Sequence, residues 1–194
     1  MTQATTSDLD ALGNAFLTDA RQRFVKMKTS VERAAAQASD EQFFQPLEED
    51  GNSIALLMKH MSGNLESRFT DFLTSDGEKP TRDRDGEFAR EAGDSRQTIT
   101  AGWERGWNAL WGALDSVSAG DLLRTVKIRG EPHTVIQALL RQVAHQSMHA
   151  GQVIILARHW AGAKWETLSI PRGKSKEFEA GMRERQGQGK TSTQ

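Results

Sequence analysis

The stretch of sequence that decides the fold is Thr134–Trp160, TVIQALLRQVAHQSMHAGQVIILARHW. Wound as a helix, it is apolar around most of its circumference, which is typical of a helix buried among other helices. Its polar residues recur at three- and four-residue spacing and therefore share one face. They are Arg141, Gln142, His145, His149 and Gln152. Because buried polar groups without partners are costly, this face predicts a hydrogen-bonded network or a binding site.

Histidines on two predicted helices are the candidate metal ligands. His145 and His149 lie one helical turn apart, a spacing that suits two imidazole ligands of a divalent metal inside a helical bundle. The same spacing also fits two core histidines hydrogen-bonded to their neighbours. A third histidine, His60, lies beside the apolar stripe of another predicted helix and shares a polar flank with Asn64 and Arg68. A lone histidine there is usually structural, but this flank makes His60 a candidate for the wall of a shared pocket.

Composition narrows the class of protein. The chain has 194 residues, suits a single domain and carries a net charge of −1, so it lacks the basic field that a nucleic-acid or acidic-membrane partner requires. It contains no cysteine, which excludes disulfides, thiolate metal sites and a cysteine nucleophile. Histidine and carboxylate remain as metal ligands. The first residues do not resemble a signal peptide and no apolar run reaches about 20 residues, so we expect a cytoplasmic protein.

Hydrophobic periodicity predicts an all-α protein with four long helices. The first three cover about 7–37, 52–73 and 94–116; they are capped by Ser7, by Asn52 or Ser53, and by Asp94 or Ser95. Thr134 caps the fourth helix, which follows a short β-like run over 125–129 and a break in which we expect a solvated His133. The third helix carries Trp103, Trp107 and Trp111, which we expect in the core or in a dimer interface rather than in a substrate stack.

Two charged segments remain outside this pattern. Residues 74–88 read as a solvated loop; in the alternative interpretation some of its charged residues fold over the mouth of a pocket. Those residues are Asp76, Glu78, Lys79, Arg82, Arg84 and Asp85. The stretch 170–176 is basic and extended, and either belongs to a solvated tail or contacts an anion near the pocket. From about residue 179 the chain is polar enough to be disordered.

Long segments of the chain carry a family resemblance. They are NSIALLMKHMSGNLESRFTDFLTSDGEKPTRDRDGEF over 52–88, VKIRGEPHTVIQALLRQVAHQSMHAGQ over 126–152 and WETLSIPRGKSKEF over 165–178. The chain resembles the DinB/YfiT-like metalloenzyme superfamily of four-helix bundles, and within it a bacterial branch described only as a domain of unknown function. The resemblance covers about 7–178, and it implies one DinB-like domain there, followed by the tail 179–194.

The resemblance implies a mononuclear site in which His60, His145 and His149 bind one divalent ion, with zinc or nickel the most suitable, and leave positions open. It further implies a small-molecule substrate and either thiol-dependent S-transfer or hydrolysis. Since the chain has no cysteine, a low-molecular-weight thiol would have to arrive as a cosubstrate. We expect Gln142 and Gln152 to orient the imidazoles. Asn64, Arg68 and Arg141 are the candidate substrate-binding residues.

The sequence leaves three functions open. The first is a metal-dependent enzyme, a transferase or hydrolase that works as a homodimer; no His-Glu-x-x-His pattern is present, which disfavours a metallopeptidase of that kind. The second is a metal-binding or stress-associated bundle without turnover. The third is a bundle that binds no metal and satisfies its core histidines internally.

Overall fold

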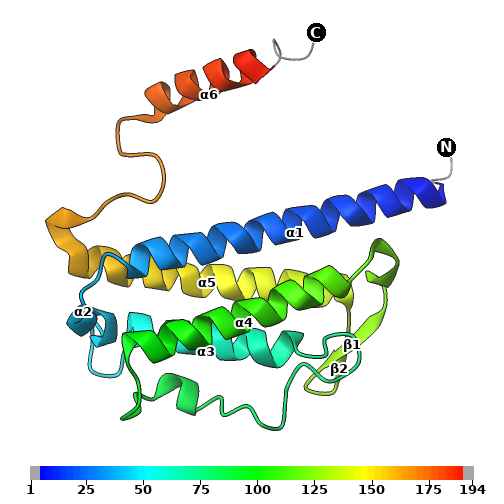
Figure 1. The fold of residues 1–194 in the computed structure, drawn as a ribbon, viewed down its shortest axis with the longest axis horizontal. Helices are drawn as coiled ribbons and strands as arrows, with labels where there is room; N and C mark the ends of the chain where they lie inside the picture. Colours follow the sequence, from blue (N-terminus) through cyan, green and yellow to red (C-terminus); the bar gives the residue numbers. More distant parts are fainter. Residues whose placement is uncertain (1–4, 190–194) are drawn as a thin grey trace. The chain divides into compact units, whose positions relative to one another are not determined.

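The computed structural model describes residues 5–189, which divide into two units, one ending at Gly162 and the other beginning at Ala163. The first unit contains four long helices, a short helix, two single 3-10 turns and a hairpin (Figure 1). They are α1 (Thr6–Ala35), α2 (Asp40–Phe44), α3 (Ile54–Phe69), η1 (Gly86–Phe88), α4 (Arg96–Ser116), η2 (Ala119–Asp121), β1 (Thr125–Ile128), β2 (Glu131–Thr134) and α5 (Val135–Ala161). The predicted helical bundle is confirmed.

Side-chain caps explain where the long helices begin. Ser53, Ser95 and Thr134 each accept a hydrogen bond from a backbone N–H of the first turn, as predicted. The first helix begins slightly earlier than predicted, because Thr5 and not Ser7 is its cap. α3 ends at Phe69 rather than near residue 73, since the chain turns extended at once and Asp71 adopts a left-handed conformation with φ 49°.

Among the four long helices, α3 packs against both α4 and α5. α1 and α5 run in one direction and α3 and α4 in the other (Figure 1). Trp103 and Trp107 on α4 are fully buried, so the core interpretation of these two tryptophans is confirmed. Trp103 Nε1 donates to Glu32 Oε1 of α1 at 3.0 Å, which satisfies its polar atom and ties α4 to α1. This packing leaves the polar faces of α3 and α5 opposite each other.

The predicted single β-like run is an antiparallel hairpin of β1 and β2. Its turn residues Arg129 and Gly130 both have positive φ, 57° and 78°, as a tight two-residue hairpin turn requires. Asp76 compensates the strain at Arg129 by accepting both backbone N–H groups, at 2.8 and 2.7 Å. The prediction of a solvated His133 is wrong: it pairs with Val126 in the hairpin, and only 17% of its side chain is exposed.

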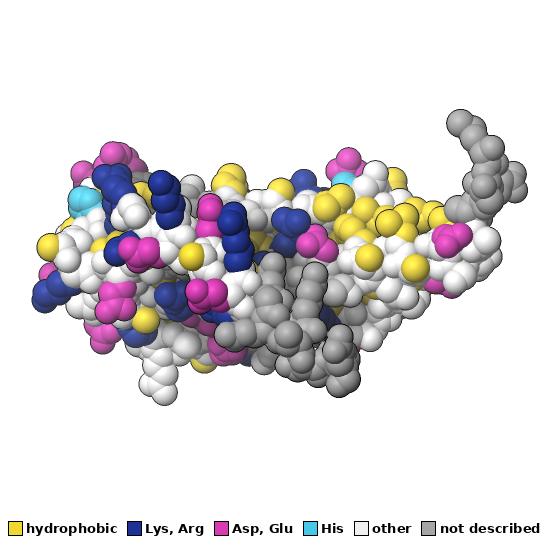
Figure 2. All heavy atoms as spheres, turned by 90° about the horizontal axis from the view of Figure 1, so that it is seen from above, with side chains coloured by type: hydrophobic (Ala, Val, Ile, Leu, Met, Phe, Trp, Pro, Cys, Tyr) yellow, Lys and Arg dark blue, Asp and Glu magenta, His cyan; other side chains and the backbone are white. Residues whose placement is uncertain are grey.

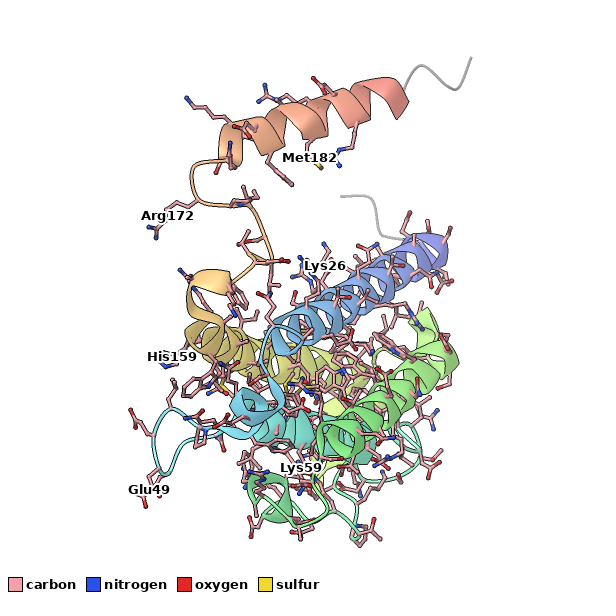
Figure 3. All side chains as sticks on the ribbon, turned by 60° about the vertical axis from the view of Figure 1, so that its left-hand side comes forward. Lys26, Glu49, Lys59, His159, Arg172 and Met182 are labelled. Carbon is pink, nitrogen blue, oxygen red and sulfur yellow. The ribbon has the colours of Figure 1, made fainter. Side chains whose placement is uncertain are left out.

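The second unit holds the end of the turn η3 (Gly162–Lys164) and the helix α6 (Ser175–Gly189). The basic stretch 170–176 is exposed, and its last two residues already belong to α6 rather than to an extended segment. Figure 3 labels Arg172 in the segment that precedes α6. α6 is helical where composition predicts disorder, although most of its described side chains are exposed. The division into a domain over 7–178 and a disordered tail over 179–194 stays a prediction; of this tail, 190–194 lie outside the described residues. No helix of the described chain is long and apolar enough to cross a membrane.

Candidate metal centre

Three imidazoles meet where α3 faces α5. His60 comes from α3, and His145 and His149 come from α5; one ring nitrogen of each lies within 4.8 Å of the others. His60 Nε2 and His145 Nε2 are 3.1 Å apart. Two nitrogens bound to one tetrahedral ion at ordinary zinc distances would lie roughly 3.3 Å apart. The described side chains thus form a three-histidine cluster that could hold a metal ion.

Two buried glutamines fix the register of α3 against α5. Gln146 is fully buried and its Nε2 donates to the backbone carbonyl of Met61 at 3.2 Å. Gln142 Nε2 donates to Asn64 Oδ1 at 2.8 Å, one turn earlier on α5 and one turn later on α3. Since the helices run in opposite directions, these two bonds set His60 opposite the pair on α5.

Neighbouring acceptors determine which ring nitrogen carries the proton in two of the histidines. His60 Nδ1 lies 2.8 Å from Glu87 Oε2, and His149 Nδ1 lies 2.7 Å from Gln152 Oε1. A carboxylate and an amide oxygen can only accept, so both imidazoles carry a proton on Nδ1. In the neutral ring this tautomer leaves the lone pair on Nε2, so each imidazole can offer Nε2 to a metal, in the arrangement by which outer partners commonly orient metal-binding histidines.

Glu87 is held in its charged form. Arg82 donates to both of its oxygens, from Nε at 2.7 Å and from Nη2 at 2.8 Å. Burial by itself would raise the pKa of Glu87, but the hydrogen bonds from His60 and Arg82 outweigh burial and lower it. The side chains of Glu87 and Arg82 are 8% and 4% exposed, so this ion pair is part of the interior.

The remaining histidine fits a ligand rather than a network residue. His145 Nδ1 is buried and has no hydrogen-bond partner, in contrast to the Nδ1 atoms of the other two. Burial, and then the neighbouring His149 and His60, lowers the pKa of His145 to about 3. Burial also lowers the pKa of His149. The lowered pKa values favour the neutral forms of His145 and His149. Neutral imidazoles in a buried cluster suit a cation, so the residues present fit the metal that the resemblance implies.

A cavity of about 310 Å³ opens onto the cluster. Its wall contains the three histidines and nine further residues: Asn64, Arg68, Arg82, Arg84, Phe88, Arg129, Arg141, Gln142 and Met148. Three of them come from the segment predicted as a solvated loop, and the ring of Phe88 lies over His60 with centroids 4.4 Å apart. The alternative interpretation, that some charged residues of 74–88 fold over the mouth of a pocket, therefore fits Arg82 and Arg84, which line the cavity.

The predicted supporting residues differ in what they contact. Gln152 bonds an imidazole, as expected, whereas Gln142 bonds Asn64 and contacts no imidazole by hydrogen bond. Arg68 lines the cavity, but its guanidinium donates to the carbonyl of Gly77 and to Glu78. Arg141 lies exposed at the cavity. These positions are compatible with substrate contact at Asn64 and Arg141, and their roles stay predictions.

Comparison with known proteins gives the family. The family described as "Protein of unknown function (DUF1572)" matches residues 11–174 of this chain. The chain belongs to the DUF1572 family. Among solved structures, a DinB-like protein from Bacillus cereus ATCC 10987 superposes with a TM-score of 0.53 at 18% identity, over 72% of this chain and 89% of that one. This likeness shows that the DUF1572 chain has a DinB-like fold. No curated protein matches its sequence.

Sequence reasoning missed Glu87 in this DUF1572 protein. The residue lies in a charge-rich loop, 27 positions after His60, where no periodicity distinguishes it from the surrounding acids. The aromatic Phe88 beside it was the one available signal, since an apolar residue in a charged loop indicates a buried anchor. Gly63 shows the same contact from the side of α3: a Cβ there would lie 2.4 Å from Glu87 Oε1, so only glycine leaves room for the carboxylate.

Proposed function

We propose that this protein is a metal-dependent enzyme that acts on a small molecule at His60, His145 and His149. The single observation that carries the proposal is that these imidazoles converge at the wall of an open cavity large enough for a small ligand. A closed structural site would have no such access. Three imidazoles without a carboxylate ligand suit zinc or nickel. A bound ion of this kind would supply Lewis acidity, which lowers the pKa of a thiol or water and polarises a carbonyl.

Thiol-dependent S-transfer is the first candidate reaction. The cavity wall, within the described chain, contains no aspartate or glutamate that could serve as a general base toward water. A thiol cosubstrate does not need that base, because lowering its pKa is enough to make it nucleophilic at neutral pH. Hydrolysis is the second candidate. The chain's own contribution is positional: Glu87 and Gln152 hold their imidazoles in one tautomer, and the Asn64 and Gln142 amides offer polar contacts to a substrate.

The alternative is a metal-binding or stress-associated bundle without turnover. Both functions include a metal, and they differ in whether small molecules reach it. The first measurement is elemental analysis of untagged protein beside His60→Ala, His145→Ala and His149→Ala; His133→Ala, a histidine outside the cluster, is the matched control. We expect one zinc or nickel ion per chain in the parent and the control, and a loss in the three cluster variants. Equal metal content in all five proteins, or none after incubation with either ion, contradicts the proposal.

Access is tested on the cobalt-substituted protein. We expect 2-mercaptoethanol to change its visible absorption spectrum, because a thiol that enters the cavity reaches the ion. An unchanged spectrum at saturating thiol would favour the non-catalytic alternative. The proposal also includes a homodimer and a cytoplasmic location. Leu9 and Leu12 of α1 are exposed and offer apolar surface to a second copy. Figure 2 shows hydrophobic side chains gathered toward this end of the molecule.

A further inference from the structure

Arginines dominate the charge of the cavity wall. Five of them line the cavity and come from four different segments: Arg68 of α3, Arg82 and Arg84 of the loop before η1, Arg129 of the hairpin turn and Arg141 of α5. No acidic side chain lines it in the part of the chain that the structure describes. Segments far apart in sequence thus deliver the same charge to one small space, which is the electrostatic pattern of an anion site.

The five arginines form two layers. Arg68 and Arg82 are buried and neutralised, because Arg68 pairs with Glu78 at 2.9 Å and Arg82 pairs with Glu87. Their guanidinium groups hold the loop in place. Arg68 also donates to the backbone carbonyl of Gly77, so it fixes the chain rather than a ligand. This placement argues against the substrate-binding role that the sequence suggested for Arg68.

The outer layer consists of Arg84, Arg129 and Arg141, whose positive charges are not all neutralised by carboxylates. Arg129 shares Glu78 with Arg68, at 2.8 Å. Arg84 lies over the Phe88 ring at 5.4 Å, and its nearest carboxylate, at 4.0 Å, belongs to a fully exposed aspartate. Arg141 has no carboxylate partner within the described residues. Glu78 and Glu87 are therefore outnumbered by the five arginines, and Arg84 and Arg141 are free to bind a ligand.

Arg141 is also well placed along its helix. It precedes His145 by one turn on the same face of α5, so the two side chains start roughly 5–6 Å apart at Cβ. A molecule that fills a cavity of about 310 Å³ can bridge this distance. We infer that the substrate is a small molecule with a carboxylate or phosphate group, which Arg141 and Arg84 bind while its reacting end lies at the histidines. The placement of the reacting end at the histidines rests on the proposed function, whereas the binding of an anion by Arg141 and Arg84 does not.

Calorimetric titration of the zinc-loaded full-length chain with succinate, and separately with inorganic phosphate, tests the inference. We expect one of them to bind, and the dissociation constant to rise about tenfold or more in Arg141→Gln and in Arg84→Gln, since each loses a charge-assisted hydrogen bond. Arg158→Gln, an exposed arginine on α5 away from the cavity, is the matched control and should bind as the parent does. The anion that binds more tightly identifies the group, carboxylate or phosphate.

Two results would overturn the inference: neither anion binds, or binding is the same in the arginine variants as in Arg158→Gln. Elemental analysis of the same samples separates this outcome from failure of the proposed function. One zinc per chain with no arginine-dependent anion binding removes the anion site and leaves the metal centre. Arginine-dependent binding by a parent protein that retains no zinc after incubation with the ion supports the anion site and removes the metal centre.

Discussion

Glu87→Gln removes the negative charge from the buried carboxylate that joins His60 to Arg82. The change keeps the shape of the side chain but leaves the guanidinium of Arg82, 4% exposed, without its bidentate partner. Losing an outer partner of a metal-binding histidine typically lowers metal affinity by about 10- to 100-fold. Breaking a buried ion pair from one side costs about 3–5 kcal/mol of unfolding free energy. Both losses are expected here, because one carboxylate serves both neighbours.

Two measurements separate these effects. Competition with a chromogenic chelator gives the zinc dissociation constant, and urea unfolding of metal-free protein gives the free energy of unfolding. The matched control is Glu91→Gln. This glutamate is 61% exposed, and its Oε1 lies 3.5 Å from Lys59 Nζ. Figure 3 labels Lys59 of α3 on the side next to the loop before α4. An exposed pair contributes about 1 kcal/mol at most, so the control should leave both quantities nearly unchanged.

The double variant Glu87→Gln, Arg82→Gln completes the test. Removing both charges relieves the unpaired guanidinium, so part of the lost unfolding free energy should return. Zinc affinity should stay low, because the charged acceptor for His60 Nδ1–H is still absent. Zinc affinity within twofold of the parent in Glu87→Gln, with only the unfolding free energy reduced, would refute the reasoning and reduce Glu87 to an anchor of the loop.

Three further predictions follow from the same site. Gly63→Ala should weaken zinc binding in the chelator assay without touching a ligand, because its Cβ displaces Glu87, whereas Gly112→Ala on the open side of α4 should not. The pKa of His145 is lowered from 6.5 to about 3, so between these values the unfolded chain binds a proton that the folded chain does not. Metal-free protein should therefore lose unfolding free energy as pH falls from about 6.5 toward 3, and an equal slope in His145→Gln would contradict this. Gln152→Ala, which removes an imidazole acceptor, should raise the zinc dissociation constant about tenfold, and unchanged affinity would show that this amide is dispensable.

The helices were predictable because their signals are local. The caps at Ser53, Ser95 and Thr134 and the hydrophobic stripes behind them are set by residues within one or two turns, so the sequence reveals them directly. Only the first strand of the hairpin was predicted from the sequence. Its turn depends on an arginine in the left-handed region, which propensity disfavours, and the compensating acceptors come from Asp76, about 53 residues earlier.

The residues of the site also differ in whether a local or a long-range contact positions them. Helical spacing alone puts His145 and His149 on one face, whereas the partner of His60 depends on where a charged loop passes. That path is fixed by contacts between distant segments: Asp76 holds the turn of the hairpin, and Glu78 binds Arg68 of α3 and Arg129 of that turn. With the loop held there, two of its next charged residues, Arg82 and Arg84, line the cavity wall. Two of the charges that read as a solvated loop are therefore part of the wall, and the pairing of arginines with Glu78 and Glu87 decides which of them remain free for a ligand.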